Sequence, residues 1–483
     1  MPVFEGSLKP EDSRTIRVYE LQVPAGTREI VIDLSYNPRT VEDRGEALTL
    51  VQNLLAIEGS QVPAEQVLTQ FWPLRNLLNV VAFDPRGRFR GRWDRNRPEQ
   101  RSAAVIAEQG SSPGMVDDSI PAGMWQLCLE IHQVLTPLKY TLRIDASDEI
   151  PGLVTPGLRA PGSGPVVSGS PEMTGDWVKG DLHVHTEHSD GRQPVAEVVS
   201  ALMEEGLDFF ALTDHNTTTG LRDLPDGGLL TLPGFELTTF WGHATCLGLS
   251  EFVPWYDGAR PRPLRQIAAE VRAAGGLVCV AHPFSPPNPL CAGCQWEFPG
   301  FDWEDADLLE IWNGDQHEHA AINAAALELW DRLLNAGRRI WGVAGSDMHD
   351  LQHLKTKRYA RTLLRVTERS TGGILRALRA GKIVVTSGPA LAMRALVRRR
   401  PYDIGETVRV RAGETVTVQG SAHDAPADVQ TRMVVGGSRN PVPLRWTHVL
   451  RADQPTWVRA EVVAGSTVLA LTNPIFIDVI RDS

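Results

Sequence analysis

The first part of the chain alternates apolar and polar residues. Between residues 14 and 36 this alternation continues on both sides of a Pro-Ala-Gly turn at 24–26, which predicts two half-buried strands joined by a turn. Similar runs follow around residues 80–83 and 125–131. We therefore predict that residues 1–150 form a β-sandwich or jelly-roll-like accessory module.

The pattern changes after residues 151–175, which are rich in Pro, Gly and Ser and are typical of a linker. From residue 176 to 395, short apolar runs of strand length alternate with helical stretches. Such alternation predicts an α/β domain with a parallel or barrel-like sheet. Strand-like alternation returns over 396–483 and predicts a small β-rich C-terminal module. Helices of the central domain are expected near 195–206, 262–274, 319–336 and 369–380.

Composition narrows the class of protein. A chain of 483 residues has room for about three domains, and 42% hydrophobic residues suit an ordinary folded protein. The net charge of −11 opposes non-specific nucleic-acid binding, which depends on clustered Lys and Arg. Five cysteines, no signal-peptide pattern and no apolar window of about 20 residues favour a cytoplasmic protein without a membrane segment. These features do not define an oligomeric state.

Histidines gather in the central part of the chain. Ten of the 13 lie between residues 183 and 353, and most follow directly after an apolar, strand-like run. In (β/α) domains the carboxyl ends of the strands meet on one face, so polar residues that close the strands share one pocket. The placement predicts a functional site built from strand ends.

The first of these strand ends carries His183 and His185, with Asp190 a short distance beyond. Because side chains on a strand alternate between its two faces, both imidazoles point the same way and can bind one metal ion. Asp190 can add an oxygen ligand for a neighbouring ion. The next strand ends at Asp214 and His215. We interpret Asp214 as a turn or helix-capping residue and His215 as a ligand.

Further strand ends complete the set. Glu236 follows an apolar run, where a carboxylate can bridge two metal ions. His243 begins the next strand, and a tight connection returns it to the same rim; His282 ends another run. Asp347 and His349 close the last one, and we expect them on one strand face. Donors of these types and number exceed one tetrahedral ion and predict two or three divalent ions, Zn²⁺, Mn²⁺ or Fe²⁺. The predicted ligands are His183, His185, Asp190, His215, Glu236, His243, His282, Asp347 and His349.

These motifs resemble those of the polymerase and histidinol phosphatase superfamily, known as PHP, over roughly residues 177–390. The matching segments are DLHVHTEHSDG at 181–191, LTDHN at 212–216, GFE at 234–236, AHP at 281–283 and GSDMH at 345–349. Together they are specific, whereas each alone is not. The flanks also resemble the carbaryl-hydrolase-like branch, in AFDPRGRFRGRW at 82–93, PAGMW at 121–125, LLEIWNG at 308–314 and LTNPIFID at 471–478.

The resemblance implies a distorted (β/α)7 barrel with three metals, flanked here by N-terminal and C-terminal β-sandwich-like modules. It assigns the first metal to His183, His185, Glu236 and Asp347. The second metal shares Glu236 and takes His243 and His282, and the third takes Asp190, His215 and His349. The spacing after the bridging Glu varies in the family, which makes His243 the least fixed of the nine.

The expected chemistry is hydrolysis of a small-molecule ester. Metals lower the pKa of water and neutralise charge on the substrate, so we expect in-line attack of a metal-bridging hydroxide on a phosphomonoester or phosphodiester. The same site can hydrolyse a carboxyl ester or a carbamate, which is the alternative within enzymes. An alternative of another class is a non-catalytic metal-binding recognition module. Serine hydrolysis is disfavoured because Ser346 lacks the Gly-x-Ser-x-Gly context.

Other residues are candidates for acid catalysis and substrate binding. His353 or His188 is a candidate general acid. Lys355 and Arg361 belong to a basic stretch that is interpreted equally as a solvated loop or as a substrate-binding segment. Asn313 closes an apolar run and is a candidate for orienting substrate.

Two remaining features are interpreted as structural. Cys291 and Cys294 form a single CxxC motif, which we interpret as a plain loop rather than a zinc or redox site, because no second pair accompanies it. His317 and His319 open a predicted helix and are expected at the surface.

Overall fold

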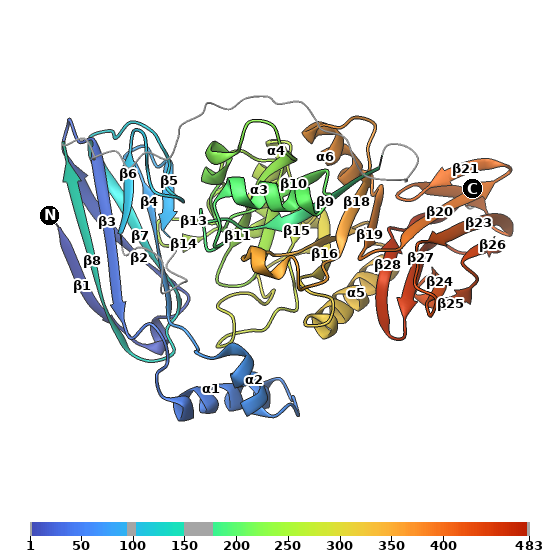
Figure 1. The fold of residues 1–483 in the computed structure, drawn as a ribbon, viewed down its shortest axis with the longest axis horizontal. Coiled ribbons are helices and arrows are strands. Elements are labelled where there is room, and N and C mark those ends of the chain that lie inside the picture. Colours follow the sequence, from blue (N-terminus) through green and yellow to red (C-terminus); the bar gives the residue numbers. More distant parts are fainter. Residues whose placement is uncertain (1, 94–102, 149–176, 481–483) are drawn as a thin grey trace.

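A computed structural model of the chain describes residues 2–93, 103–148 and 177–480. An N-terminal β module, a central mixed α/β region and a C-terminal β region follow one another along the long axis (Figure 1). The linker predicted over 151–175 lies outside the described residues. Within the described residues, no helix is long and apolar enough to cross a membrane.

Two four-stranded antiparallel sheets form the N-terminal module. One has the order β1-β8-β3-β6 and the other β2-β7-β4-β5. Inward-facing side chains such as Ile30, Trp125 and Leu142 are fully buried in one core, which is what the alternating pattern requires. The strands are β1 (Val3–Leu8), β2 (Thr15–Val23), β3 (Glu29–Asn37), β4 (Leu77–Phe83), β5 (Phe89–Trp93), β6 (Ala103–Ala107), β7 (Gly123–Gln133) and β8 (Leu138–Ser147).

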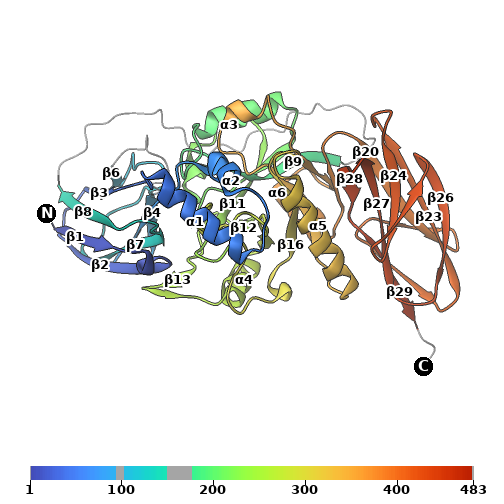
Figure 2. The same ribbon diagram turned by 90° about the horizontal axis from the view of Figure 1, so that it is seen from below.

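Two helices, α1 (Arg44–Ile57) and α2 (Ala64–Phe71), interrupt this module. The alternating pattern of the N-terminal sequence does not predict them. The Asp43 side chain caps α1 by accepting a hydrogen bond from the Glu46 backbone N–H at 2.8 Å. The hairpin projects beneath the central region (Figures 1 and 2).

The central sheet is mixed rather than parallel, with the order β17-β16-β15-β12-β11-β10-β9-β18-β19. Strands β9, β10 and β11 are mutually parallel, as are β15, β16 and β17, but β12 runs antiparallel to β11 and β15. The reason is the short connection from β11 to β12, residues 239–242, which permits only an antiparallel return. The strands are β9 (Trp177–Val184), β10 (Phe209–Leu212), β11 (Leu230–Thr238), β12 (His243–Leu247), β13 (Tyr256–Asp257), β14 (Arg260–Pro261), β15 (Leu277–Val280), β16 (Leu308–Asn313), β17 (Trp341–Gly345), β18 (Arg361–Arg365) and β19 (Ile383–Thr386).

Four helices cover the central sheet close to the positions expected for them. Helix α4 packs on β15, α5 on β16, and α6 on β11 and β18. Their apolar faces bury residues such as Phe209, Leu308 and Trp330 in the main core. The helices are α3 (Val195–Glu204), α4 (Leu264–Ala273), α5 (Ala320–Asn335) and α6 (Thr371–Arg379).

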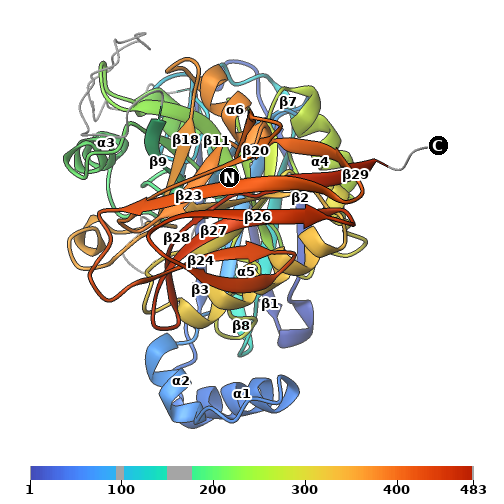
Figure 3. The ribbon, with the colours of Figure 1, turned by 90° about the vertical axis from the view of Figure 1, so that its right-hand side faces the viewer.

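The central sheet continues into the C-terminal region, because β28 pairs antiparallel with β19. A second sheet has the order β21-β20-β23-β26. Figure 3 views the molecule from the side of the C-terminal region, whose strands run across the picture. The predicted boundary at residue 395 falls within β20. The strands are β20 (Ala390–Val397), β21 (Arg400–Asp403), β22 (Thr407–Arg411), β23 (Glu414–His423), β24 (Gln430–Val435), β25 (Ser438–Val442), β26 (Arg445–Ala452), β27 (Thr456–Ala464), β28 (Thr467–Thr472) and β29 (Ile475–Ile480).

Candidate metal centre

Polar side chains converge where the central strands end. His183 lies in β9, Glu236 lies in β11 and His243 begins β12. The remaining donors stand in the loops that follow β9, β10, β15 and β17. The structure therefore brings together all nine residues predicted as ligands: His183, His185, Asp190, His215, Glu236, His243, His282, Asp347 and His349.

The first group of donors surrounds the ring nitrogens of His183 and His185, whose Nε2 atoms lie 3.1 Å apart. Asp347 Oδ1 lies 3.4 Å from Nε2 of His183 and 3.2 Å from Nε2 of His185. Glu236 places one oxygen 3.4 Å from the first of these nitrogens and the other 3.3 Å from the second. Four side chains from three strand ends thus face one point.

The second group is centred on Glu236. Its Oε1 atom lies 3.0 Å from Nδ1 of His243 and 3.0 Å from Nε2 of His282. His243 reaches this position because it pairs with Thr238 at the end of the β11–β12 pair, directly beside the turn. The carboxylate of Glu236 therefore belongs to both groups, as a bridging ligand must.

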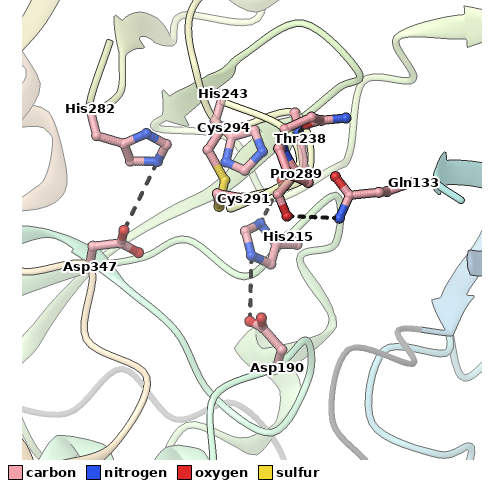
Figure 4. The surroundings of a disulfide bond; sticks show 12 residues. Gln133, Asp190, His215, Thr238, His243, His282, Pro289, Cys291, Cys294 and Asp347 are labelled. Carbon is pink, nitrogen blue, oxygen red and sulfur yellow. Dashed lines mark hydrogen bonds and ion pairs between the residues drawn. A yellow bond between two sulfur atoms is a disulfide. The ribbon is translucent and has the colours of Figure 1, made fainter. Parts of the chain in front are cut away.

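The third group lies beyond His185. Oδ1 of Asp190 is 3.4 Å from Nε2 of His215 and 3.0 Å from Nε2 of His349. The other ring nitrogen of His215 lies 2.8 Å from Glu236 Oε2, which connects this group with the second. Figure 4 shows Asp190, His215 and His243 on one side of the centre and His282 with Asp347 on the other.

The backbone around Asp347 does not continue the strand, although Asp347 and His349 were expected to lie on one strand face. Strand β17 ends at Gly345, and Asp347 adopts a left-handed conformation with φ of +52°. The side chains of Asp347 and His349 therefore do not share a strand face. His349 follows a tight turn, and its Nδ1 donates to the carbonyl oxygen of Asp347 at 2.8 Å. The turn, rather than strand periodicity, points both residues into the centre.

The donor set fits divalent metal ions. Ligands at about 2.1 Å from a tetrahedral ion lie about 3.4 Å apart, which is close to the separations in the first group. His243 is 5% exposed, and its Nε2 atom has no hydrogen-bond partner among the described residues. Imidazole nitrogens and carboxylate oxygens together are typical ligands of Zn²⁺, Mn²⁺ and Fe²⁺. The donors form overlapping sets, each within 4.8 Å: His183, His185 and Glu236; His183, His282 and Asp347; His215, Glu236 and His243; His185, Asp190, His215 and His349.

The carboxylates of the centre are ionised. Burial raises the pKa of Asp190, Glu236 and Asp347, but the surrounding histidines outweigh it and hold each pKa well below its usual range. The three carboxylates are therefore ionised at neutral pH. Burial lowers the pKa of His243 to about 4, which keeps this imidazole neutral and able to act as a ligand.

Glu310, which the sequence analysis did not select, supports two of the ligands. Its Oε1 lies 3.2 Å from Nδ1 of His183, and its Oε2 accepts the backbone N–H of His282 at 2.8 Å. The side chain is buried within β16. The sequence does contain a signal for Glu310, which is a single carboxylate inside the apolar run LLEIWN. A buried acid needs a hydrogen-bonding or charged partner.

Two further carboxylates hold the loops that carry the ligands. Asp214 accepts hydrogen bonds from the backbone and the hydroxyl of Thr186, at 2.8 and 2.7 Å, and from the hydroxyl of Ser189 at 2.7 Å. Its role is structural, but its side chain joins two loops rather than capping a helix or forming a turn. Asp181 accepts the backbone N–H of Ser346 at 2.9 Å and pairs with the guanidinium of Arg361.

The other candidate residues occupy different surroundings. Both ring nitrogens of His188 are engaged, with Thr219 Oγ1 at 2.9 Å and Asp223 Oδ2 at 2.8 Å. Asn313 is buried and donates to Glu310 at 3.0 Å. The exposed residues are His353, Lys355 and His317, whereas His319 and Arg361 are half-buried.

The plain-loop interpretation of the CxxC motif is wrong. Cys291 and Cys294 form a disulfide, and the other three cysteines are buried and unpaired. The loop returns tightly enough to bring both sulfur atoms together, which the spacing alone does not reveal. In Figure 4 this disulfide lies beside His243 and His215.

Comparisons with known proteins show what the central region is similar to. The PHP domain family matches residues 181–266. An uncharacterized protein of Methanocaldococcus jannaschii is 27% identical in an alignment of 165 residues that covers 31% of this chain and 90% of that protein. The 3',5'-nucleoside bisphosphate phosphatase of Chromobacterium violaceum is 31% identical in an alignment of 114 residues that covers 20% of this chain and 40% of that protein.

Among solved structures, a two-domain protein from Bacteroides vulgatus is described as containing a predicted PHP-like metal-dependent phosphoesterase. It has 17% identity and a TM-score of 0.33 over 62% of this chain and 95% of that one. The family match spans the predicted ligands from His183 to His243. The central region of this chain is therefore similar to the PHP domain over residues 181–266.

Proposed function

We propose that this protein is a metal-dependent hydrolase of small phosphoesters. The convergence of six imidazoles and three carboxylates in one largely buried centre, with Glu236 shared between groups, is the observation that carries the proposal. The similarity to the phosphatase of Chromobacterium violaceum gives further support. Divalent ions at such donors lower the pKa of water and neutralise charge on a phosphoryl group.

The residues of the chain orient this chemistry. Glu236 fixes the spacing between the first two groups, and the burial of His183 and His185 excludes bulk water from the inner side. The side chains of Asp347 and His349 are 23% and 34% exposed, so substrate approaches from their side. Lys355 is exposed shortly after His349 in the chain and is proposed to contact the substrate.

The leaving group needs a proton at its oxygen. We assign this role to His353, which is exposed in the turn Leu351–His353, because both ring nitrogens of His188 are already engaged. Asn313 and Arg361, which pair with Glu310 and Asp181, are proposed to position residues of the centre rather than to bind substrate. Replacing His353 with Ala should slow the hydrolysis of poor leaving groups more than that of good ones.

Two finer assignments belong to the same proposal. The central strands are proposed to close into a distorted seven-stranded barrel, which the parallel bridge between Val184 and Met348 and the contact of β17 with β9 support. The chain is also proposed to belong to the carbaryl-hydrolase-like branch, on the flanking segments that resemble it.

Hydrolysis of a substrate panel tests the proposal. Purified protein is stripped with a chelator, reloaded with Mn²⁺ or Zn²⁺, and assayed on nitrophenyl phosphate, a nitrophenyl phosphodiester and nitrophenyl acetate. We expect phosphoester hydrolysis that chelation abolishes and metal restores. Glu236→Gln should lower the rate at least about a hundredfold, because losing a direct ligand costs more than losing a residue that only orients a ligand. Asp257→Asn, at an exposed position, should leave the rate unchanged.

The same panel distinguishes the alternatives. Hydrolysis of nitrophenyl acetate without hydrolysis of either phosphoester would favour a carboxyl-ester or carbamate hydrolase. Stoichiometric metal binding without turnover of any substrate would favour a recognition module. Full activity of the metal-free protein would contradict the proposal itself.

A further inference from the structure

The loop over residues 283–297 follows one predicted ligand of the metal centre and packs beside a second. It begins directly after His282, and its far end packs beside His243. There the backbone N–H of Glu297 donates to the carbonyl of Trp241 at 2.6 Å, and the Trp296 N–H donates to Pro283 at 3.2 Å. A Cβ atom on Gly242, the residue before His243, would lie only 3.0 Å from the Cα of Trp296. The position of this loop therefore bears on His243 and His282, which both contact Oε1 of Glu236.

The disulfide Cys291–Cys294 closes the middle of this loop. Gly293, between the two cysteines, has a φ of +77°, and a Cβ there would lie 2.5 Å from the carbonyl oxygen of Thr239. The loop thus rests directly on the backbone that follows β11, the strand that carries Glu236. Cys294 is 7% exposed, whereas Cys291 is half-buried and within reach of a reductant. Figure 4 draws His243 and His215 among the residues that surround the disulfide.

We propose that Cys291 and Cys294 form a reversible redox site that controls how tightly the Glu236–His243–His282 group holds its metal ion. The inference rests on the metal-binding part of the proposed function and adds a modification site to it. The oxidised pair holds the turn around Gly293 closed where it packs against the carbonyl of Thr239, and so supports the backbone that leads to His243. Reduction removes this cross-link and lets the turn around Gly293 relax away from Thr239.

The reaction is a thiol–disulfide exchange with a dithiol reductant. A thiolate of the reductant attacks one cysteine sulfur, the Cys291–Cys294 bond breaks, and the second thiol of the reductant displaces the first cysteine from the mixed disulfide. Two electrons pass from the reductant to the cysteines, which end as two thiols with two protons. The reductant ends as its own disulfide.

The remaining cysteines are poor candidates for the same chemistry. Burial raises the pKa of Cys128 to about 12 and raises the pKa of Cys246 and Cys279 as well, so these thiols do not form thiolates near neutral pH. The CxxC pair is therefore the redox-responsive element among the five cysteines.

Contacts with the N-terminal module limit the size of the effect. The side chain of Gln133 donates to the carbonyl of Pro289 at 3.2 Å, and Arg14 pairs with Glu297 at 3.3 Å. These contacts hold the loop in place after reduction, although less firmly. We therefore expect weaker metal binding rather than loss of the fold.

Metal binding by the full chain in two redox states tests the proposal. Stripped protein is prepared oxidised, or reduced with a phosphine that is then removed under nitrogen, and is titrated with Mn²⁺, a hard ion that thiols bind poorly. Thiol counting after denaturation should give the three free cysteines in the oxidised form and all 5 in the reduced form. The dissociation constant of one Mn²⁺ equivalent should rise about tenfold on reduction, as for a lost outer-shell contact.

Two variants sharpen the test. The double variant Cys291→Ser/Cys294→Ser should bind Mn²⁺ as weakly as the reduced protein and should not respond to reductant. Cys128→Ala, which keeps the pair, should respond as the unchanged protein does. Equal Mn²⁺ affinity in both redox states, no binding in either, or five thiols in the oxidised sample would overturn the inference. A redox-dependent affinity without phosphoester hydrolysis would instead refute the proposed function alone.

Discussion

The carboxylate of Glu310 contacts Nδ1 of His183 at 3.2 Å and, through its second oxygen, accepts the backbone N–H of His282 at 2.8 Å. One buried side chain thus orients His183 in β9 and His282 in the loop that follows β15. The first contact leaves Nε2 of His183 to face the other donors, because a ring nitrogen that donates to a carboxylate fixes the tautomer. Close packing of Gly345 against Glu310 keeps this contact in place, since a Cβ there would lie 2.2 Å from Oε1.

Replacing Glu310 should weaken metal binding. Glu310→Ala is expected to raise the dissociation constant for Mn²⁺ by about 10- to 100-fold, because His183 loses its orienting partner. Glu310→Gln keeps one acceptor oxygen and should recover part of the affinity. Equilibrium dialysis measures both, with exposed Glu204→Ala as the matched control. A purely structural role predicts a lower melting temperature with an unchanged dissociation constant, which would contradict the assignment.

Removing the buried Arg459 should destabilise the contact between the C-terminal region and α5. Its guanidinium pairs with Asp331 of α5 and with Glu461, and it lies 5.0 Å from the ring of Trp330. Arg459→Ala leaves Asp331 and Glu461 with only the more exposed Arg439 as their cation, at an expected cost of about 3 kcal/mol. The urea midpoint should fall clearly, whereas exposed Arg451→Ala should leave it nearly unchanged. Equal midpoints for the two variants would show that the triad is not a stabilising contact.

Stability should depend on pH through Glu130, which lies 3.1 Å from Arg92 and 3.2 Å from His132. Burial opposes its ionisation, but the charges of Arg92 and His132 lower its pKa below the ordinary value of 4.5. The unfolded chain therefore binds the proton more readily than the folded one. The stabilisation is present above pH 4.5 and is lost as the pH falls through the lower, folded pKa.

Melting temperatures recorded from neutral pH downward test this dependence. The unchanged protein should lose stability below about pH 4.5, and Glu130→Gln, which cannot ionise, should show a shallower decline. The variant will also be less stable at neutral pH, because Arg92 then lacks its carboxylate. Parallel curves for the two proteins would exclude Glu130 as the titrating group.

Much of the centre follows from strand periodicity. His183 and His185 are two residues apart at the end of an apolar run, so their side chains had to share a face. The short 239–242 connection made an antiparallel return of His243 the simplest arrangement. The bounds of α5 agree with the expected helix because its apolar positions, including Leu327, Trp330 and Leu334, follow helical spacing.

Other features depend on contacts that a linear pattern does not encode. Glu310 looks like an interruption of a buried strand until the ring of His183 is placed against it. Asp347 reaches the centre through a left-handed turn, although the residues before it form a regular strand. The pairing of Cys291 with Cys294 requires the loop to return on itself, and the helices α1 and α2 stand in a module whose other segments alternate as strands.

Anomalous scattering from crystals grown with Zn²⁺ tests the central claim most directly. We expect at least two metal peaks within about 2.0–2.2 Å of the donor atoms, with Glu236 contacting more than one of them. Crystals that show the nine side chains in the same cavity without a metal peak, or that show the side chains apart, would contradict the account.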